Sequence, residues 1–456
     1  MSHCNDVIAA IATGKSPCAI GILRLSGAGC AEVAGTVFSL DSGLRLADAP
    51  NRKLLLGTLH DRKGRVIDQA MAVYCRAPHS YTGEDTVELQ CHGSPAMLAA
   101  ALEALFAAGA RQAGPGEFTK RAFLNGQLDL TQAEAVIDLI DAETADAAAN
   151  AAGQLGGALL RRLTPVYDRM TDLCSHFHAV LDYPDEDIED FGLDELSGTL
   201  EFARAELRRL LATYERGSFL KNGVRTVLLG RPNAGKSSLF NALAGFDRVI
   251  VTEIAGTTRD TVEETVRVGS VLLRLTDTAG IREAADCIEA LGVERSEEAA
   301  KAAELAIFVC DGAQPLNDED RRAIESAKRA PYAIAVINKA DLPLRVRPEE
   351  LPFETVLTLS ALTGEHLQAL LGWVEERFGG ETHCDGSLLT NPRQFGAITR
   401  AADAIGRAQS ALADGLTPDA VLTDVEDAMQ ALGEVTGRTV REDITNRIFS
   451  RFCVGK

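Results

Sequence analysis

The stretch between Arg225 and Asp260 limits what this chain can fold into more than any other part of the sequence. It begins R-T-V-L-L-G-R-P-N-A-G-K-S-S-L-F-N-A-L and ends G-T-T-R-D. Val227 to Leu229 form a short apolar run, as in a buried strand, and Ser238 to Ala244 begin a helical pattern. The connection from Gly230 to Ser237 matches G-x-x-x-x-G-K-[ST], so the sequence predicts a strand, a phosphate-binding loop and a helix.

Phosphate binding requires these residue types at this spacing. Glycines allow backbone N–H groups to close around a phosphate chain, Lys236 reaches the outer phosphates, and Ser237 offers a hydroxyl to Mg²⁺. The N-terminus of the following helix adds partial positive charge. A glycine turn that carries a lysine by chance would not also lie between a strand and a helix. We therefore predict a nucleotide-phosphate site.

Two later loops indicate which base the site prefers. Asn338-Lys339-Ala340-Asp341 follows an apolar strand, and Ser360-Ala361 follows the next one. The carboxylate of Asp341 can accept hydrogen bonds from the ring N–H and the amino group of guanine, whereas adenine presents a different donor pattern. N-K-x-D alone is a weak signal. Behind a phosphate loop and D-T-A-G (Asp277 to Gly280), it predicts GTP rather than ATP.

The same comparison with GTPases assigns the residues around Mg²⁺. We expect Asp277 to bind the ion through water and Thr258 to complete the metal shell when GTP is bound. The backbone N–H of Gly280 should sense the γ-phosphate.

The machinery for hydrolysis is less complete in the sequence. Ile281 stands where Ras-type GTPases place the glutamine that orients the attacking water. Another group must do so, and the nearby acids are Glu283, Asp286 and Glu289. No arginine finger can be assigned either. Asn233, with carbonyls from the segment 246–257, could hold a monovalent cation that neutralises developing charge, or it could only shape the loop.

Composition narrows the class of protein. At 456 residues the chain suggests about three domains. A formal charge of −20 argues against a broad surface that tracks phosphates, although a local basic pocket could still hold RNA. The ten cysteines form no C-x-x-C pair, which favours a reducing cytosol. Because no leader and no apolar run of about 18 residues is visible, we expect a cytoplasmic protein without a membrane segment.

The hydrophobic patterns predict a multidomain chain. Mixed strands and helices give a compact α+β domain over residues 1–122. Helical patterns occupy 123–220 and 381–456, and each is too short for a core of its own. Between them, over 221–380, short apolar strands alternate with helices. We therefore expect a Ras-like α/β G domain inserted into an all-α domain that is discontinuous in sequence.

Four local expectations follow from the pattern. Ala31 to Leu40 is expected to be a helix, and Pro165 to kink or interrupt the long helix that begins near residue 155. Val266 to Thr276 is expected to form an antiparallel hairpin. The acidic stretch from Asp182 to Glu201 is interpreted as a solvated loop and helix start rather than a metal site.

Several longer stretches are similar to one known family. They are D-V-I-A-A-I-A-T, Y-T-G-E-D-T-V-E-L-Q-C-H-G, P-G-E-F-T-K-R-A-F-L-N-G, L-T-Q-A-E-A-V-I-D-L-I, G-R-P-N-A-G-K-S-S-L-F-N-A-L, I-A-G-T-T-R-D and the terminal F-C-V-G-K. Together they resemble the bacterial tRNA-modification GTPases of the MnmE (TrmE) family. The resemblance covers essentially the whole chain.

The resemblance implies how GTP is held and cleaved. It makes Glu289 the acid that positions water, and Ser237 and Thr258 the Mg²⁺ ligands. It makes Asn233, Thr252, Ile254 and Thr257 the K⁺ ligands. The GTP-binding set it implies is Asn233, Ala234, Gly235, Lys236, Ser237, Ser238, Thr252, Glu253, Ile254, Ala255, Gly256, Thr257, Thr258, Asp277, Thr278, Ala279, Gly280, Asn338, Lys339, Asp341, Ser360 and Ala361.

The resemblance also implies a tetrahydrofolate site in the N-terminal domain. Arg24, Glu88, Gln127 and Lys456 fall at positions that contact 5-formyl- or 5,10-methylene-tetrahydrofolate. Gln127 stands where the family commonly has a lysine, which puts that contact in question. Cys453 lies beside the C-terminal tail and has either a role in the chemistry on tRNA or the packing role usual for a free cysteine.

The implied partners extend beyond small molecules. The family forms homodimers through the N-terminal domains, and its G domains approach each other when K⁺ and GTP are bound. An FAD-containing protein of the MnmG type joins it in a larger complex. That complex adds an aminomethyl-type group, such as carboxymethylaminomethyl, to carbon 5 of the wobble uridine of certain tRNAs.

Two other classes of function compete with this interpretation. One is an RNA-binding GTPase of ribosome assembly without modification activity, but the C-terminal segment has neither a basic cluster nor a strand-flanked G-x-x-G loop. The other is a scaffold protein whose only function is to change its dimer state with the bound nucleotide.

Overall fold

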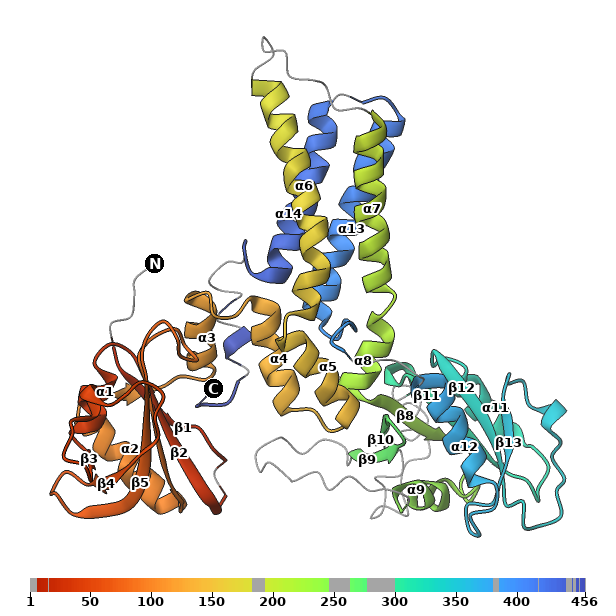
Figure 1. Ribbon diagram of the computed structural model, residues 1–456. Helices are drawn as coiled ribbons and strands as arrows, with labels where there is room; N and C mark the ends of the chain where they lie inside the picture. The colour runs from red at the N-terminus through yellow and green to blue at the C-terminus, as the bar shows by residue number, and fades with distance from the viewer. Residues whose placement is uncertain are drawn as a thin grey trace. The chain divides into compact units, whose positions relative to one another are not determined.

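The computed structural model describes residues 6–14, 16–182, 193–245, 263–276, 300–379, 385–416, 418–439, 445, 448–450 and 452–455. The contacts between residues divide the chain into two compact units. The first unit comprises Met1–Ile140, Gln154–Leu207 and Gly396–Lys456, and the second comprises Asp141–Gly153 and Arg208–Phe395. Each unit contains one β-sheet (Figure 1).

A seven-stranded sheet dominates the N-terminal part of the first unit, in the order β3-β4-β5-β6-β2-β1-β7. The strands pair antiparallel, except that β1 and β7 are parallel. Their bounds are β1 Ile8–Ile11, β2 Cys18–Ser26, β3 Phe38–Leu40, β4 Leu55–His60, β5 Val66–Cys75, β6 Thr86–Gly93 and β7 Arg111–Gln112.

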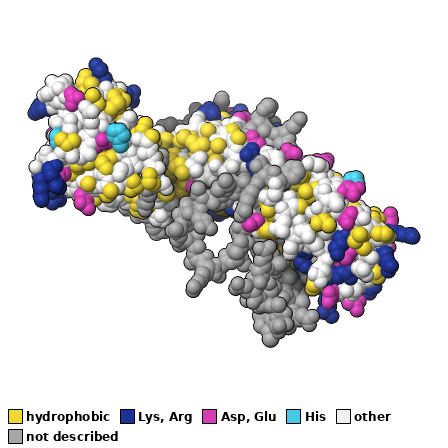
Figure 2. Space-filling model, turned by 90° about the horizontal axis from the view of Figure 1, so that it is seen from below, with side chains coloured by type: hydrophobic (Ala, Val, Ile, Leu, Met, Phe, Trp, Pro, Cys, Tyr) yellow, Lys and Arg dark blue, Asp and Glu magenta, His cyan; other side chains and the backbone are white. Residues whose placement is uncertain are grey.

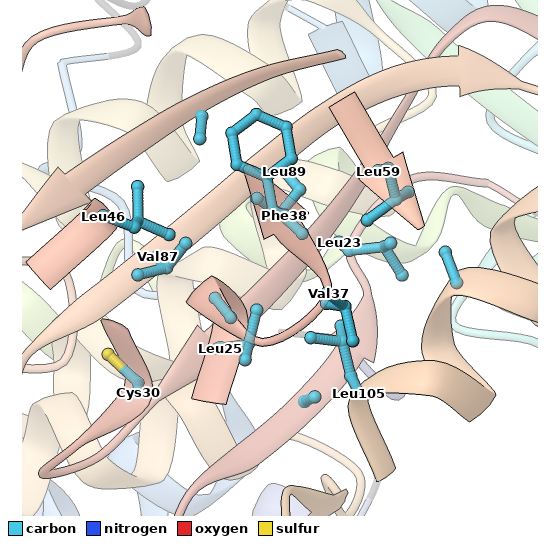
Figure 3. Close-up of a cluster of buried hydrophobic side chains, with 14 of the residues drawn as sticks. Leu23, Leu25, Cys30, Val37, Phe38, Leu46, Leu59, Val87, Leu89 and Leu105 are labelled. Carbon is cyan, nitrogen blue, oxygen red and sulfur yellow. The ribbon is translucent and has the colours of Figure 1, made fainter. Parts of the chain in front are cut away.

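Helices α1 (Cys30–Gly35) and α2 (Pro95–Ala107) cover one face of this sheet. Alternate strand residues such as Leu23, Leu25 and Leu89 point toward the helices and are fully buried, as Figure 3 shows. A short 3₁₀ turn, η1 (Leu46–Asp48), lies between β3 and β4. The predicted helix over 31–40 is wrong in its second half, because Phe38 and Leu40 bury their side chains from strand β3 instead.

The rest of the first unit is helical. Helices α6, α7, α13 and α14 lie side by side in Figure 1, and Arg204 of α7 donates to Gln409 of α13 at 2.7 Å. Helix α6 continues through Pro165, so the predicted interruption does not occur. The helices of this unit are α3 Glu117–Leu124, α4 Leu130–Ile140, α6 Ala158–Asp182, α7 Leu193–Leu211, α13 Pro392–Ala413 and α14 Pro418–Thr436, whereas α5 Ala145–Leu155 lies almost wholly in the second unit.

The end of the chain returns to the N-terminal part of the same unit. Val454 forms an isolated antiparallel bridge with Pro115, and the N–H of Gly116 donates to the carbonyl of Cys453 at 3.3 Å. Phe449 packs against Phe123, with ring centroids 6.3 Å apart. These contacts place the terminal F-C-V-G segment beside the start of α3.

The second unit contains a six-stranded sheet in the order β13-β12-β11-β8-β10-β9. All neighbours are parallel except β9 and β10, which form the predicted antiparallel hairpin. The strand bounds are β8 Val224–Leu229, β9 Glu263–Val268, β10 Val271–Thr276, β11 Leu305–Asp311, β12 Tyr332–Asn338 and β13 Val356–Thr358.

Helices pack on both faces of this sheet, since buried residues form one cluster on each side. This is the doubly wound arrangement, in which a ligand binds at the carboxyl ends of the parallel strands. The elements are α8 Tyr214–Asn222, α9 Lys236–Ala244, α11 Asp318–Ala327, η2 Pro348–Glu350, α12 Leu367–Val374 and η3 Glu375–Gly379.

The segment that leaves the G domain is tied to the segment that enters it. The side chain of Asn150 exchanges hydrogen bonds with the backbone of Leu388, and the N–H of Leu389 donates to Thr213 Oγ1 at 3.0 Å. Tyr214 stacks on Phe395 with ring centroids 4.1 Å apart. These contacts, all within the second unit, join the segments that precede and follow its sheet.

Within the described ranges, none of the helices is both long and apolar enough to cross a membrane.

Candidate functional site

The predicted phosphate loop joins a buried strand to an exposed helix end. Residues Thr226 to Leu229 of β8 are buried. Gly235 then caps α9 in the left-handed backbone region, with φ of 96°, and Asn233 is also left-handed, with φ of 61°. Lys236 is the first residue of α9, so the N–H groups of Lys236, Ser237 and Ser238 belong to its first turn. This geometry favours an anion at the helix N-terminus.

Glycine is required at two positions of this loop. A Cβ at Gly235 would overlap the side-chain amide nitrogen of Asn338, and a Cβ at Gly230 would overlap the carbonyl oxygen of Val309. Both residues have positive φ, which a side chain rarely adopts. The loop is therefore pressed against β11 and β12 through its two motif glycines.

Lys236 folds back over the loop. Its Nζ donates to the carbonyl oxygens of Gly230, at 2.6 Å, and of Arg231, at 2.9 Å. These bonds hold the ammonium group above the loop that would enclose a phosphate chain, where its positive charge can attract outer phosphate oxygens.

The two base-recognition loops meet the phosphate loop through Asn338. This residue is 2% exposed at the end of β12. Its Nδ2 donates to the carbonyl of Ala234 at 3.0 Å, while its Oδ1 accepts from the N–H of Ala361 at 2.9 Å. One buried amide thus joins all three predicted segments. Its two partners, Ala234 and Ala361, are more than 120 positions apart in the sequence.

Asp341 and Lys339 are each held by a neighbouring side chain. Ser360, fully buried, donates to Asp341 Oδ1 at 2.5 Å, and the exposed carboxylate keeps further acceptor sites. Lys339 Nζ lies 2.7 Å from Asp311 Oδ2. Burial opposes ionisation of Asp311, but the hydrogen bonds from Lys339 and from the N–H of Ala313 hold the pKa of its carboxyl below the usual value.

Sequence reasoning missed two residues that support the loops. Asp311 orients Lys339, as described, and Asp320 lies 3.4 Å from Arg231 of the phosphate loop while being fully buried. Asp320 also accepts from the N–H of Asn317, as half of a capping box on α11. The sequence signals only Asp311, as the acidic residue that ends the apolar strand V-C-D. The contact between Arg231 and Asp320 joins residues 89 positions apart, and no sequence pattern signals it.

The described part of the site suits hard cations and phosphate. Ser237 and Asn233 are exposed at the loop, and both offer oxygen, the ligand type that Mg²⁺ and K⁺ prefer. No group of three or more His, Cys, Asp or Glu among the described residues could hold a metal by itself. The other predicted residues lie outside the described residues; they are Thr252, Glu253, Ile254, Ala255, Gly256, Thr257, Thr258, Asp277, Thr278, Ala279, Gly280, Ile281, Glu283, Asp286 and Glu289.

A second candidate site lies on the N-terminal sheet. Arg24 of β2 and Glu88 of β6 face each other across the strands, with Arg24 Nε 2.8 Å from Glu88 Oε1. The guanidinium group also lies over the ring of Tyr81, 5.2 Å from its centroid, and near Phe118 at 5.7 Å. Arg24 and Glu88 keep 17% and 27% of their side chains exposed, so an outside ligand can reach both.

A buried arginine fixes the loop that carries Tyr81. Arg121, 6% exposed, donates to Glu84 at 2.9 Å and to Asp6 at 2.8 Å. Tyr81 Oη lies 2.8 Å from Thr119 Oγ1. Helix α3 carries both Thr119 and Arg121, so it contacts the loop at Tyr81 and at Glu84. These contacts hold the Tyr81 ring over Arg24.

The remaining predicted residues of this site are partly placed. Gln127 lies beside Gly83 of the same loop, where an added Cβ would approach its Cγ to 3.1 Å. The exposed thiol of Cys453 lies on the tail next to Gly116. Lys456 is outside the described residues, but Gly455 packs against the carbonyl of Ile11 on β1, next to β2.

Comparison with protein-family models decides the family. A model described as the MnmE helical domain matches residues 130–453, and one described as the GTP-binding protein TrmE N-terminus matches residues 7–127. The chain belongs to the MnmE (TrmE) family. Its fold class is therefore confirmed: an MnmE-family chain with an α+β N-terminal part, a helical part and an inserted α/β G domain.

Full-length relatives agree with this assignment. The "tRNA modification GTPase MnmE" of Symbiobacterium thermophilum is 43% identical over 99% of this chain and 100% of its own length. The protein of the same name from Aquifex aeolicus is 40% identical with the same coverage. Among solved structures, the G domain of the T. maritima FeoB iron transporter is 24% identical over 34% of this chain and 97% of its own, with a TM-score of 0.26. A TM-score this low adds nothing to the family assignment.

Proposed function

We propose that the protein is a K⁺-activated, dimerisation-dependent GTPase that acts in tRNA modification. It hydrolyses GTP to GDP and phosphate. With an FAD-containing partner of the MnmG type, it modifies carbon 5 of the wobble uridine of certain tRNAs, using a one-carbon unit carried by 5-formyl- or 5,10-methylene-tetrahydrofolate. The observation that carries this proposal is full-length similarity to proteins named tRNA modification GTPase MnmE, at 40% identity or more.

The joined loops of the second unit support guanine nucleotide as the substrate. The phosphate loop supplies N–H groups and Lys236, and Asp341 supplies an exposed carboxylate held by Ser360. Adenine lacks the pair of donors that this carboxylate would accept. The buried amide of Asn338 fixes the distance between the two halves of the site.

Residues around the γ-phosphate would carry out hydrolysis. Glu289 is proposed to hold the attacking water, since Ile281 cannot. Ser237 and Thr258 would hold Mg²⁺, and Asn233, Thr252, Ile254 and Thr257 would hold K⁺. When bound, these cations neutralise negative charge that develops on the phosphate oxygens.

The arrangement on the N-terminal sheet supports a folate site. The carboxylate of Glu88 can accept from the amino and ring N–H groups of a pterin, and Arg24 can donate to the ligand's carboxylates or carbonyl groups. The Tyr81 and Phe118 rings beside Arg24 add flat apolar surface for a planar ligand. Gln127 and Lys456 complete the proposed set, and Cys453 is proposed as a candidate for the chemistry on tRNA.

An uncovered face of the same sheet supports a homodimer. Helices α1 and α2 cover one face. On the other face, Ile20 of β2 is 59% exposed and Leu56 of β4 is 48% exposed, and Ile22 of β2 and Met71 of β5 lie partly exposed on the same face. Figure 2 shows hydrophobic side chains reaching the surface of this part of the chain. A second copy of the domain would remove such a row from water.

The proposal includes the chain's organisation and location. We propose a folate-binding and dimerisation domain over 1–122, a helical domain formed by 123–220 and 381–456, and a G domain over 221–380. We also propose that the protein has no membrane partner and is located in the cytoplasm, where tRNA and the translation machinery are present.

Nucleotide turnover by the purified protein tests the catalytic half of the proposal. Phosphate release should be rapid with GTP and negligible with ATP. Asp341→Asn should weaken GTP and allow xanthosine triphosphate, because an amide can donate to the base where the carboxylate could only accept. Equal hydrolysis of ATP and GTP would contradict it. A ribosome-assembly GTPase, the alternative, would also hydrolyse GTP but would leave tRNA nucleosides unchanged in cells that lack it.

A further inference from the structure

The N-terminal part of the chain has a charge balance unlike the rest. Residues 1–122 contain twelve Lys and Arg and eleven Asp and Glu, whereas the whole chain has 46 and 66. Residues 1–122 therefore carry a formal charge of +1, and the remaining residues carry −21. A surface that attracts a polyanion is more easily formed on this part than anywhere else in the chain.

Four basic residues gather at one end of the N-terminal sheet, which we call the basic patch: Arg45, Arg52, Lys53 and Arg76. The backbone brings the two segments together, because the N–H of Arg52 donates to the carbonyl of Tyr74 at 2.8 Å. The N–H of Arg76 also donates to Asn51 Oδ1 at 2.9 Å. Arg45, Arg52 and Lys53 are exposed and Arg76 is half-buried.

Two of these arginines are held by uncharged groups. Arg52 Nε donates to the carbonyl of His79 at 3.1 Å. Arg76 Nη2 donates to the carbonyl of Ala47 at 3.0 Å, and its guanidinium lies 4.9 Å from the centroid of the Tyr74 ring. Carbonyls and rings orient a guanidinium without cancelling its charge, so both keep free donors for an anion.

Few acids oppose the patch. Asp48 pairs with Arg45 at 2.7 Å, and Asp85 accepts from Tyr74 Oη and the N–H of Ala77. Glu32 also lies close enough to act on Arg45, so four positive charges stand against three negative charges and the patch keeps a net positive charge. Arginine forks with free N–H groups are suited to phosphate oxygens.

One loop, 77–85, contacts both the patch and the proposed folate site. Arg52 is bonded to His79, two residues before Tyr81, and the Tyr81 ring lies over Arg24. The loop 77–85 thus has the basic patch on one side and the Arg24–Glu88 pair on the other.

We propose that the basic patch binds the phosphate backbone of the tRNA substrate. This inference rests on the proposed function and adds the surface through which the N-terminal domain contacts RNA. Phosphate contacts position a nucleic acid without reading its sequence, so the patch would fix the RNA's placement and leave the choice of uridine to other residues.

Binding of a tRNA transcript to the full-length protein, measured over a range of KCl concentrations, tests the inference. The patch variant replaces Arg45, Arg52 and Lys53 with glutamine, and leaves Arg76 because it packs on Tyr74. The control variant replaces Arg62, Lys63 and Arg65, which are exposed on the β4–β5 turn, with glutamine. Both variants lose three positive charges from the same domain.

The patch variant should bind tRNA on the order of 10- to 100-fold more weakly near 0.1 M salt, with a salt slope reduced by roughly two. The control variant should bind within about twofold of the unchanged protein. Lys53→Gln alone, a change at an exposed side chain, should reduce the slope by roughly one. GTP turnover should be the same in all three variants.

Equal losses in the patch and control variants would overturn the inference, because overall charge would then explain binding. Unchanged binding by the patch variant, or no tRNA binding by the unchanged protein, would also overturn it. The proposed function is judged separately by the modified wobble nucleoside in cells. If that nucleoside depends on the protein while the patch variant binds tRNA normally, only this inference fails.

Discussion

At the scale of single residues, the phosphate loop depends on glycines, which have no Cβ, as much as on the side chains that it carries. Gly235 allows the loop to touch Asn338, and Asn338 in turn joins the two base-recognition loops. A side chain at residue 235 would therefore disturb phosphate binding and base binding together.

Gly235→Ala tests this directly. We expect backbone strain of about 1–3 kcal/mol before any overlap with Asn338 is counted, which corresponds to roughly a ten- to hundredfold loss of GTP affinity. Gly372→Ala is the matched control, because a Cβ there on helix α12 meets nothing within 4 Å. Titration with a fluorescent GTP analogue measures both. Tight binding by Gly235→Ala would show that the loop is not constrained as described.

The cysteines differ in reactivity for a physical reason. Burial raises the pKa of Cys91 and of Cys310 to about 12, and that of Cys174 to about 11. Raised thiol pKa values mean neutral, unreactive thiols at pH 8. Cys18 and Cys453 are exposed.

Alkylation of the native protein at pH 8 should therefore label Cys18 and Cys453 well before the three buried cysteines. Raising the pH toward 11 should bring Cys174 into reaction first, if the fold persists. Peptide mass spectrometry after a short pulse of iodoacetamide gives the order. Early labelling of Cys310, inside strand β11, would contradict the buried sheet.

At the scale of elements, helix α11 supports the phosphate loop from outside it. Asp320 completes the capping box of α11 and faces Arg231 at 3.4 Å with no exposed surface. The negative charge at the first turn of the helix is also favourable for the helix itself.

Asp320→Asn should keep the N-cap bond but remove the charge opposite Arg231. We expect a loss of about 1–3 kcal/mol in the stability of the G domain, and weaker GTP binding. Asp318→Asn is the control, since Asp318 lies on the same helical turn with 89% of its side chain exposed. Urea unfolding followed by tryptophan fluorescence suits the test, because the partly buried Trp373 packs against this sheet's core. Equal stability of the two variants would remove the supporting role.

Local pattern predicted the parallel strands and the hairpin of the G domain, because short apolar runs between turn residues have few other solutions. It failed at Phe38 to Leu40, where three residues are too few for alternation to be visible. The interruption considered at Pro165 does not occur, since a helix packed along its length tolerates one missing hydrogen bond, whereas the kink stays a prediction. Contacts such as Arg231–Asp320 and Lys339–Asp311 depend on strand order, which no local pattern contains.

The residues of the candidate sites also divide into those that the sequence motifs predicted and those that they did not. The motifs predicted Lys236, Asn338 and Asp341, and the sheet brings their loops together. Family resemblance, rather than pattern, pointed to Arg24 and Glu88, which the antiparallel register places opposite each other. The roles of Glu289 and Lys456 stay predictions, as do the domain boundaries, because those residues and limits are not tested by the fold.

At the scale of the whole molecule, the proposal joins a G domain to a folate-loaded body through two crossings of the chain. Contacts of Asn150 with Leu388 and of Thr213 with Leu389, all within the second unit, join the segments that precede and follow its sheet.

Potassium should control turnover if it replaces an arginine finger. GTP hydrolysis is expected to be much faster in KCl than in NaCl at equal ionic strength, and to rise with protein concentration as G domains pair. Glu289→Ala should still bind GTP but lose on the order of 10²- to 10⁴-fold in rate. Equal rates in the two salts would remove the cation from the proposal, and full activity of the variant would remove Glu289.

The wobble uridine itself gives the most direct test of the proposed function. Bulk tRNA from cells without the gene, digested to nucleosides and separated by mass, should lack the aminomethyl-type uridine modification. The intact gene should restore it, and Lys236→Ala should not, because the phosphate loop would lose its cation. Modified uridine at normal levels in cells without the gene would contradict the account.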